Sequence, residues 1–95
     1  MSMLPHEVVH ERLARFEGWR LMGNAIERTY DRGDFNGSIR FVDAVAEAAN
    51  AADHHPDLSI SWNRVTVTLS SHDAGGVTER DFALATAIDA IAAGL

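Results

Sequence analysis

The sequence predicts an α+β fold whose elements follow in the order α-β-β-α-β-β-α. Three segments carry apolar residues at helical spacing, and between them lie two pairs of short segments typical of strands. Each pair is joined by a tight turn, which antiparallel strands allow and parallel strands do not. Helices interleaved with antiparallel hairpins favour α+β over a parallel βαβ fold. We expect one domain over residues 1–95, because half of this chain would be too small to bury its own core.

The first three elements are expected between residues 5 and 30. A helix over about residues 5–15 has Pro5 in its first turn and is ended by Gly18. The stretch from Trp19 to Tyr30 is typical of a hairpin in which Gly23-Asn24 supplies the turn.

A long helix is expected from Phe35 to Ala52, with Asp34 as its N-cap. Its apolar residues form two adjacent stripes: Phe35, Ile39, Val42, Ala46 and Ala49, beside Phe41, Val45, Ala48 and Ala52. The resulting apolar face is wide enough to cover a sheet on one side and to contact another subunit on the other.

The second hairpin is expected from Leu58 to Ser70, with Asn63-Arg64 as its turn. The first strand carries Leu58, Ile60 and Trp62, and the second carries Val65, Val67 and Leu69. By parity, His72 continues the face of Thr66, Thr68 and Ser70 if the strand runs that far without a bulge.

The last helix follows the loop Ala74-Gly75-Gly76. Thr78 is expected to cap it, and Asp81 stands where the acid of a capping box belongs. An apolar stripe then runs through Leu84, Ile88, Ile91 and Leu95.

Composition excludes several classes of function. The net charge of −6, without a Lys/Arg cluster, disfavours direct binding to nucleic acid or anionic lipid. The chain has no cysteine, so disulfides and thiolate chemistry are excluded. No apolar run approaches the roughly 20 residues of a membrane helix, and residues 1–10 do not resemble a signal peptide. We therefore expect a cytoplasmic protein that contacts neither nucleic acid nor membrane.

Three of the five histidines, His54, His55 and His72, lie within 19 residues of one another. Imidazole can give and take a proton near neutral pH, so the three suit an acid/base site. On composition alone, surface or capping histidines are an equally good interpretation. Three histidines could also hold zinc. However, adjacent His54 and His55 tend to point apart in an extended chain, so we expect no metal.

Other residues have plainer interpretations. His6 and His10 are spaced i, i+4 and would share a helix face, where solvated side chains are the expected outcome. Asp81 suits a helix N-terminus by its charge alone. Trp19 and Trp62 are expected in the core.

The stretch Asp53-His54-His55-Pro56-Asp57 resembles the pterin-4a-carbinolamine dehydratases, also known as dimerisation cofactors of a homeodomain transcription factor. That family has a His-His-Pro turn, a hairpin, a third histidine and an Asp opening the last helix. Here the spacings are 18 residues from His54 to His72 and 9 residues from His72 to Asp81. Gly18-Trp19 and Asp34-Phe35-Asn36 also match, so the resemblance covers nearly the whole chain.

The resemblance implies a four-stranded antiparallel sheet with three helices on one face, in homo-oligomers that are dimers or tetramers. It implies a hydro-lyase that dehydrates 4a-hydroxytetrahydropterin, the product of an aromatic amino acid hydroxylase, without metal or organic cofactor. By the same resemblance His54 and His72 transfer protons and His55 positions the substrate. Asp81 orients an imidazole, and Trp19 lines the pocket.

The chain departs from this family at two positions near the histidine pair. Asn50 stands where the family usually has Glu, and Asp53 stands where relatives often have Asn. Because Asn carries no charge, it cannot act on His54 as a carboxylate would. We hypothesise that Asp53 supplies that carboxylate, and we count Asn50 and Asp53 among the substrate-binding residues. The alternative is a protein with low activity, or one that has drifted from dehydration.

Three other functions stay open from the sequence. One is a module of the same fold that binds another protein, since a fold alone does not fix function. Another is a pterin-binding protein of a different pathway, such as molybdopterin metabolism. Outside the family, a zinc hydrolase would use the same histidines.

Overall fold

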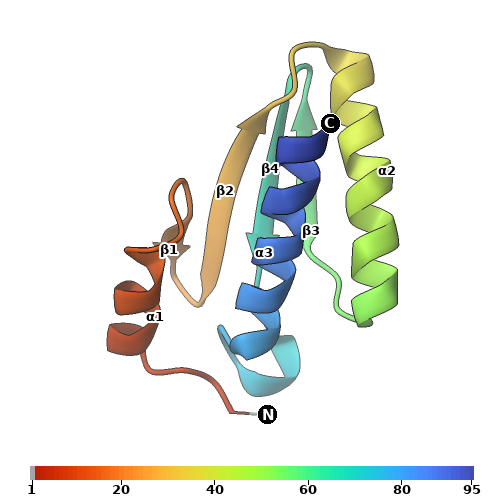
Figure 1. Ribbon diagram of the computed structural model, residues 1–95. Helices are drawn as coiled ribbons and strands as arrows, with labels where there is room; N and C mark the ends of the chain where they lie inside the picture. Colours follow the sequence, from red (N-terminus) through yellow and green to blue (C-terminus); the bar gives the residue numbers. More distant parts are fainter. Residues whose placement is uncertain (1) are drawn as a thin grey trace.

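The computed structural model describes residues 2–95, and Met1 lies outside the described residues. Its elements follow in the predicted order (Figure 1). They are α1 (His6–Leu13), β1 (Arg20–Met22), β2 (Ala25–Asp31), α2 (Phe35–Ala52), β3 (Asp57–Ser61), β4 (Arg64–Leu69), the short 3₁₀ helix η1 (His72–Ala74) and α3 (Glu79–Gly94).

The four strands form one antiparallel sheet in the order β1-β2-β4-β3. The central ladder joins β2 to β4 and pairs Ile26 with Leu69 and Tyr30 with Val65. β3 returns along the outer side of β4, with Leu58 opposite Val67. The α+β prediction is therefore confirmed, and so are three helices with a four-stranded antiparallel sheet.

The two faces of the sheet differ because side chains alternate along each strand. One face carries the fully buried residues Ile26, Val65, Val67 and Leu69. The opposite face is polar: Thr29 bonds Thr66 at 2.9 Å between their hydroxyl oxygens, and Thr68 donates to Glu27 at 3.0 Å. The helices therefore have one apolar face to cover.

Figure 1 shows α2 and α3 side by side in front of the sheet, with α1 beside β1. α2 buries Phe41, Val45 and Ala49, and α3 buries Phe82, Leu84, Ala85 and Ile88. Full burial of one large apolar side chain contributes roughly 1.5–3 kcal/mol. Val9 of α1 is also fully buried in this core.

The turn of the second hairpin differs from the prediction. Ser61 pairs with Arg64, so the turn consists of Trp62 and Asn63. Trp62 has left-handed backbone (φ 53°), and its side chain is 70% exposed. The expectations that Trp62 lies in a strand and in the core were wrong. The turn is fixed from outside the hairpin, because Ser38 of α2 donates to the Trp62 carbonyl at 2.7 Å.

The region of His72 also differs from the prediction. β4 ends at Leu69, and a bridge between Ser71 and Gly76 closes a small loop that contains η1. His72 begins that 3₁₀ helix and is exposed, so strand parity does not place it. The first helix is slightly shorter than predicted, because α1 ends at Leu13. Leu95, predicted in the apolar stripe of the last helix, lies beyond α3 and is 61% exposed.

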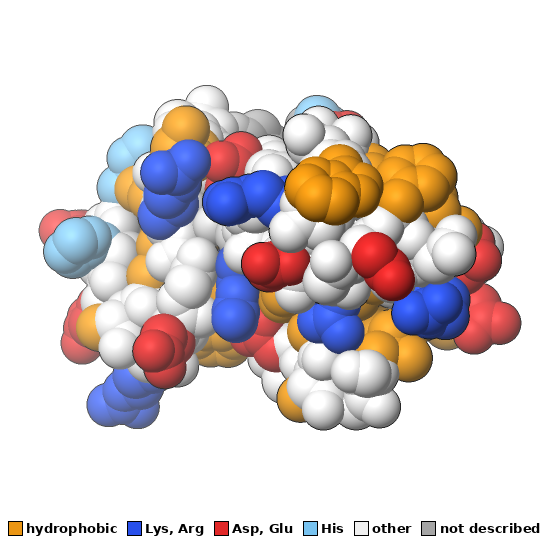
Figure 2. Space-filling view, turned by 90° about the horizontal axis from the view of Figure 1, so that it is seen from above, with side chains coloured by type: hydrophobic (Ala, Val, Ile, Leu, Met, Phe, Trp, Pro, Cys, Tyr) orange, Lys and Arg blue, Asp and Glu red, His pale blue; other side chains and the backbone are white. Residues whose placement is uncertain are grey.

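The first part of one apolar stripe of α2 remains uncovered in the single chain, whereas Ala49 at its far end is buried. Phe35 is 52% exposed and Ile39 is 37% exposed, while Phe41 and Val45 of the other stripe are buried. Figure 2 views the end of the molecule that holds the first turn of α2, and hydrophobic side chains stand there among acidic and basic ones. Within residues 2–95, no helix has the length and apolar character needed to cross a bilayer.

Candidate active site

The end of α2 turns the chain so that His54 and His55 face different surroundings. Asp53 adopts the left-handed conformation (φ 49°), which Asp tolerates better than most residues. The His54 backbone N–H then donates to the Ala49 carbonyl at 3.1 Å. His54 is consequently buried (8% exposed), while His55 is exposed.

His54 is bound to a buried carboxylate. Its Nε2 lies 2.6 Å from Oδ1 of Asp81, which has no exposed surface. Asp81 also closes the capping box of α3, because its Oδ2 accepts from the Thr78 backbone N–H at 2.9 Å. The predicted capping box is confirmed, and the same carboxylate that starts α3 holds His54.

His55 has a neutral partner instead. Its Nε2 lies 3.0 Å from Oδ1 of Asn50, in the last turn of α2. Asn50 therefore contacts His55, whereas the sequence led us to expect an effect on His54. Among the hydrogen bonds of residues 2–95, none joins Asp53 to a histidine, and the carboxylate on His54 is that of Asp81. Asp53 lines the same hollow as His54, and its role as the carboxylate that replaces the usual Glu stays a prediction.

The three histidines meet at one surface hollow. Its volume is about 240 Å³, and its lining consists of Asp53, His54, His55, Ser70, His72 and Asp73. The end of α2, the end of β4 and the loop with η1 each contribute to it. The sequence-predicted histidines therefore come together, although His72 arrives by a loop and not by a strand.

Charge at this hollow is mixed. Arg80 Nη2 lies 2.5 Å from Oδ1 of Asp73, and this hydrogen bond lowers the pKa of the Asp73 carboxyl below its ordinary value. Asp73 is therefore ionised near neutral pH. Imidazoles beside a fixed negative charge can supply both a proton donor and a proton acceptor to a bound molecule.

His54 also borders a second, apolar groove between α2 and α3. This groove has a volume of about 270 Å³ and is lined by Ala48, Ala52, His54, Arg80, Ala83, Leu84 and Ala87. Arg80, Ser70 and Asp73 were not recognised from the sequence. Their only signal in the sequence is that they stand next to or near Asp81 and His72. They reach the site because the loop with η1 and the start of α3 lie against the end of α2.

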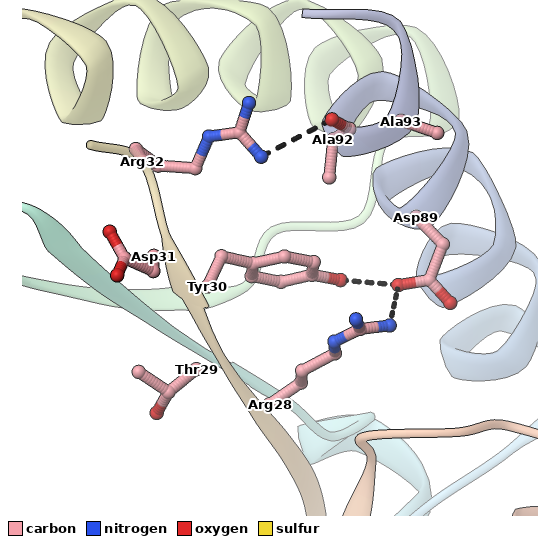
Figure 3. A pocket seen from close by; sticks show the side chains of 8 residues that line it. All are labelled: Arg28, Thr29, Tyr30, Asp31, Arg32, Asp89, Ala92 and Ala93. Atoms are coloured by element: carbon pink, nitrogen blue, oxygen red, sulfur yellow. Dashed lines mark hydrogen bonds and ion pairs between the residues drawn. The ribbon is translucent and has the colours of Figure 1, made fainter.

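Trp19 lies elsewhere in the single chain. It is buried (5% exposed), as expected of a core residue, and its Nε1 donates to both oxygens of Asp89 at 3.1 Å. Figure 3 shows the neighbouring hollow, where Tyr30 and Arg28 point to the same carboxylate. The distances to Asp89 Oδ1 are 2.5 Å from the Tyr30 hydroxyl and 2.9 Å from Arg28 Nη1.

The hollow around Asp89 is larger than the histidine hollow, at about 430 Å³, but its main polar groups are bound to one another. We therefore interpret it as structural, and the structure does not bring Trp19 to the histidine hollow. His6 and His10 are exposed on α1. Over residues 2–95, no three potential ligand side chains lie close enough together to hold a metal ion.

Comparison with known proteins gives the family. Residues 2–91 match the family described as pterin 4 alpha carbinolamine dehydratase. The chain is 49% identical over 84 residues to a protein of Thermosynechococcus vestitus, covering 88% of each. It is 50% identical over 91 residues to one of Chloroflexus aurantiacus, covering 96% of this chain and 98% of the relative. Both relatives bear the name pterin-4-alpha-carbinolamine dehydratase as a provisional assignment.

Two solved structures are similar. The crystal structure of a transcriptional coactivator/pterin dehydratase from Brucella melitensis has a TM-score of 0.91 and 35% identity, over 96% of this chain and 99% of that one. A pterin dehydratase-like protein identified as a RuBisCO assembly factor in the alpha-carboxysome has a TM-score of 0.68 and 25% identity, over 80% and 90%. By its sequence and its fold, the chain belongs to the pterin-4a-carbinolamine dehydratase family.

Proposed function

We propose that this protein dehydrates 4a-hydroxytetrahydropterin to quinonoid dihydropterin by histidine acid/base catalysis. Membership of the family supports pterin carbinolamine dehydratase activity. The observation that carries the proposal is the single hollow lined by His54, His55 and His72, with His54 held by a buried carboxylate.

The chemistry needs one proton donor and one proton acceptor. An imidazolium gives its proton to the 4a oxygen, the C4a–O bond breaks, and water leaves. A neutral imidazole takes the proton from N5, and the electrons of the N5–H bond form the N5=C4a double bond. Each positioned acid or base of this kind contributes roughly 10²–10⁴-fold. The step is redox-neutral and needs no oxidant or reductant, and we propose that the histidines carry it without a metal or organic cofactor.

The residue roles that we propose are those that the family resemblance implies. We assign His54 and His72 to proton transfer and His55 to substrate positioning. Asn50 and Asp53 supply polar atoms for the substrate near the hollow, and Asp81 positions His54. Because Trp19 lines a third hollow, beside His10 and Leu13 of α1, we place it away from the substrate within one chain.

The wider setting is also part of the proposal. The substrate would come from an aromatic amino acid hydroxylase, so the protein would recycle tetrahydropterin in the cytoplasm. The exposed apolar residues of α2 support a homo-oligomer, either a dimer or a tetramer, in which a copy covers Phe35 and Ile39. The acidic surface supports the absence of nucleic-acid and membrane partners.

A second candidate function is a protein-binding module of the same fold. One similar structure is that of a transcriptional coactivator/pterin dehydratase, and another is that of a pterin dehydratase-like RuBisCO assembly factor. The exposed residues Phe35 and Ile39 of α2 are compatible with this candidate as well, because a helix of another protein could cover them just as a copy could.

The deciding experiment is the rate of 4a-hydroxytetrahydropterin dehydration by purified protein, beside His54→Ala and His72→Ala. His10→Ala, on the exposed surface of α1, is the matched control. We expect acceleration over the spontaneous rate in wild type and in the control, and its loss in both site variants. A wild-type protein that does not accelerate the reaction would exclude the dehydratase and leave the binding module.

A further inference from the structure

Four polar side chains lie together in the interior where α3 begins. Ser71 is 1% exposed, Thr78 and Asp81 are 0% exposed, and His54 is 8% exposed. Buried polar groups are costly unless they are hydrogen-bonded. Here every side chain of this cluster has a partner within the cluster, so its donors and acceptors can be counted.

The count fixes the direction of each hydroxyl. An ionised carboxylate only accepts, so Ser71 must donate its single hydroxyl hydrogen to Asp81 Oδ2, 2.9 Å away. The bond of 2.8 Å between Ser71 Oγ and Thr78 Oγ1 then has Thr78 as its donor. Thr78 Oγ1 in turn accepts from the Arg80 backbone N–H at 3.2 Å.

The same count fixes the ring of His54. Oδ2 of Asp81 is occupied by Ser71 and by the Thr78 backbone N–H, so Oδ1 is the oxygen left for His54. Since that oxygen carries no hydrogen, Nε2 of His54 must carry one. With Asp81 as a carboxylate, neutral His54 therefore has its hydrogen on Nε2, and its lone pair for hydrogen bonding is on Nδ1.

We propose that Ser71 is a positioning residue that orients Asp81 and thereby fixes His54 as its Nε2–H tautomer, leaving Nδ1 for proton exchange. Without the Ser71 hydroxyl, Oδ2 keeps a single donor and the Thr78 hydroxyl loses its acceptor. Apart from His54 itself, the carboxylate is then held only by the Thr78 backbone N–H, so we expect it to turn away from His54 in part of the population, where His54 adopts the other tautomer. The catalytic meaning of this tautomer rests on the proposed function, whereas the tautomer itself does not.

The test is long-range ¹H–¹⁵N NMR of the histidine rings in the full chain, at a pH where His54 is neutral. In wild type we expect one His54 species, protonated at Nε2. In Ser71→Ala we expect both tautomers, and in Ser59→Ala, an exposed serine of β3, the wild-type spectrum. Wild-type His54 protonated at Nδ1, or Ser71→Ala with Nε2–H alone, would overturn the proposal.

Two further measurements separate a folding defect of Ser71→Ala from a loss of the tautomer, and the tautomer from its catalytic role. If Ser71→Ala does not fold, Ser71→Cys keeps the size with a weaker donor, and retention of pure Nε2–H there counts against the proposal. In the dehydration assay we expect Ser71→Ala to lower kcat by about tenfold, the order of one hydrogen bond, with little change in KM. A Ser71→Ala variant with mixed tautomers and unchanged kcat would contradict only the catalytic role. The NMR result stands even if the protein dehydrates nothing.

Discussion

Nε2 of His54 and Oδ1 of Asp81 lie 2.6 Å apart in the interior, although 27 positions separate the two residues in the chain. The contact joins the end of α2 to the first turn of α3. One carboxylate therefore serves helix capping and the candidate acid/base site together.

Because the two side chains share one buried bond, their substitutions are expected not to add. His54→Ala and Asp81→Asn should each lower the free energy of unfolding by about 1–3 kcal/mol. The double variant should lose less than the sum, by about 1–2 kcal/mol. Urea unfolding of the four proteins at one pH measures this coupling. As a control, His54→Ala combined with His10→Ala, on the exposed surface of α1, should be additive, and additivity in the Asp81 cycle as well would mean that the contact contributes nothing.

Asp53 is expected to matter less to turnover than Asp81. Its carboxylate has no hydrogen bond to a histidine within residues 2–95, and Asn tolerates left-handed backbone as well as Asp does. Asp53→Asn should keep stability within about 0.5 kcal/mol and slow dehydration by less than Asp81→Asn does. Steady-state rates of both variants decide this. A larger loss in Asp53→Asn would restore Asp53 as the carboxylate that assists catalysis.

Asn50 can be tested against the residue usual in the family. Asn50→Glu would place a charged acceptor beside His55, and a charge-assisted hydrogen bond is about twice as strong as a neutral one. We expect faster dehydration in Asn50→Glu and no gain in Asn50→Gln, which has the same length without the charge. Equal rates in the two variants would show that the missing charge does not limit this protein.

Tyr30 provides an alkaline transition that can be observed directly. Burial, and then the hydrogen bond to Asp89, hold the pKa of Tyr30 far above its ordinary value. In the unfolded chain tyrosine ionises near pH 10, roughly its ordinary value. Above that pH the unfolded state binds fewer protons than the folded state. The free energy of unfolding therefore falls with rising pH, by up to about 1.4 kcal/mol per pH unit.

The chain has a single tyrosine, so tyrosinate absorbance reports Tyr30 alone. Folded protein at pH 11 should show almost no tyrosinate, and protein unfolded in urea should show nearly complete ionisation. Tyr30→Phe should lose this part of the alkaline destabilisation. Ordinary ionisation near pH 10 in the folded protein would mean that the burial of Tyr30 and its bond to Asp89 are not kept in solution.

Local sequence patterns predicted the features that depend on residues close together in the chain, such as helix caps and the buried face of a strand. Thr78 and Asp81 form a capping box because its two residues are three positions apart in the chain. Val65, Val67 and Leu69 are buried because alternation marks one face of a strand. The partners of the site side chains were not predictable in this way. Asn50 lies within reach of both histidines along the chain, and only the left-handed backbone of Asp53 decides which of them it meets.

Long-range packing explains the remaining differences. Trp62 leaves the strand because Ser38 holds its carbonyl from α2, and no pattern near Trp62 announces that bond. Trp19 is a core residue as expected, yet its indole is directed by Asp89, 70 positions away. Ser71 was not recognised because a serine before a histidine has no signal of its own until Asp81 is placed beside it.

The β2–β4 ladder has a consequence for how this site comes into being. Ala25–Asp31 can pair with Arg64–Leu69 only after α2 and β3 have been made, and Asp81 follows later still. During synthesis on the ribosome, the histidine pair would therefore emerge long before the carboxylate that holds it. A chain released after residue 77 would contain all the histidines and no Asp81. The NMR signal of the His54 imidazole, in its Asp81-bound state, would then report the last stage of folding, since that state requires α3 to have packed against α2.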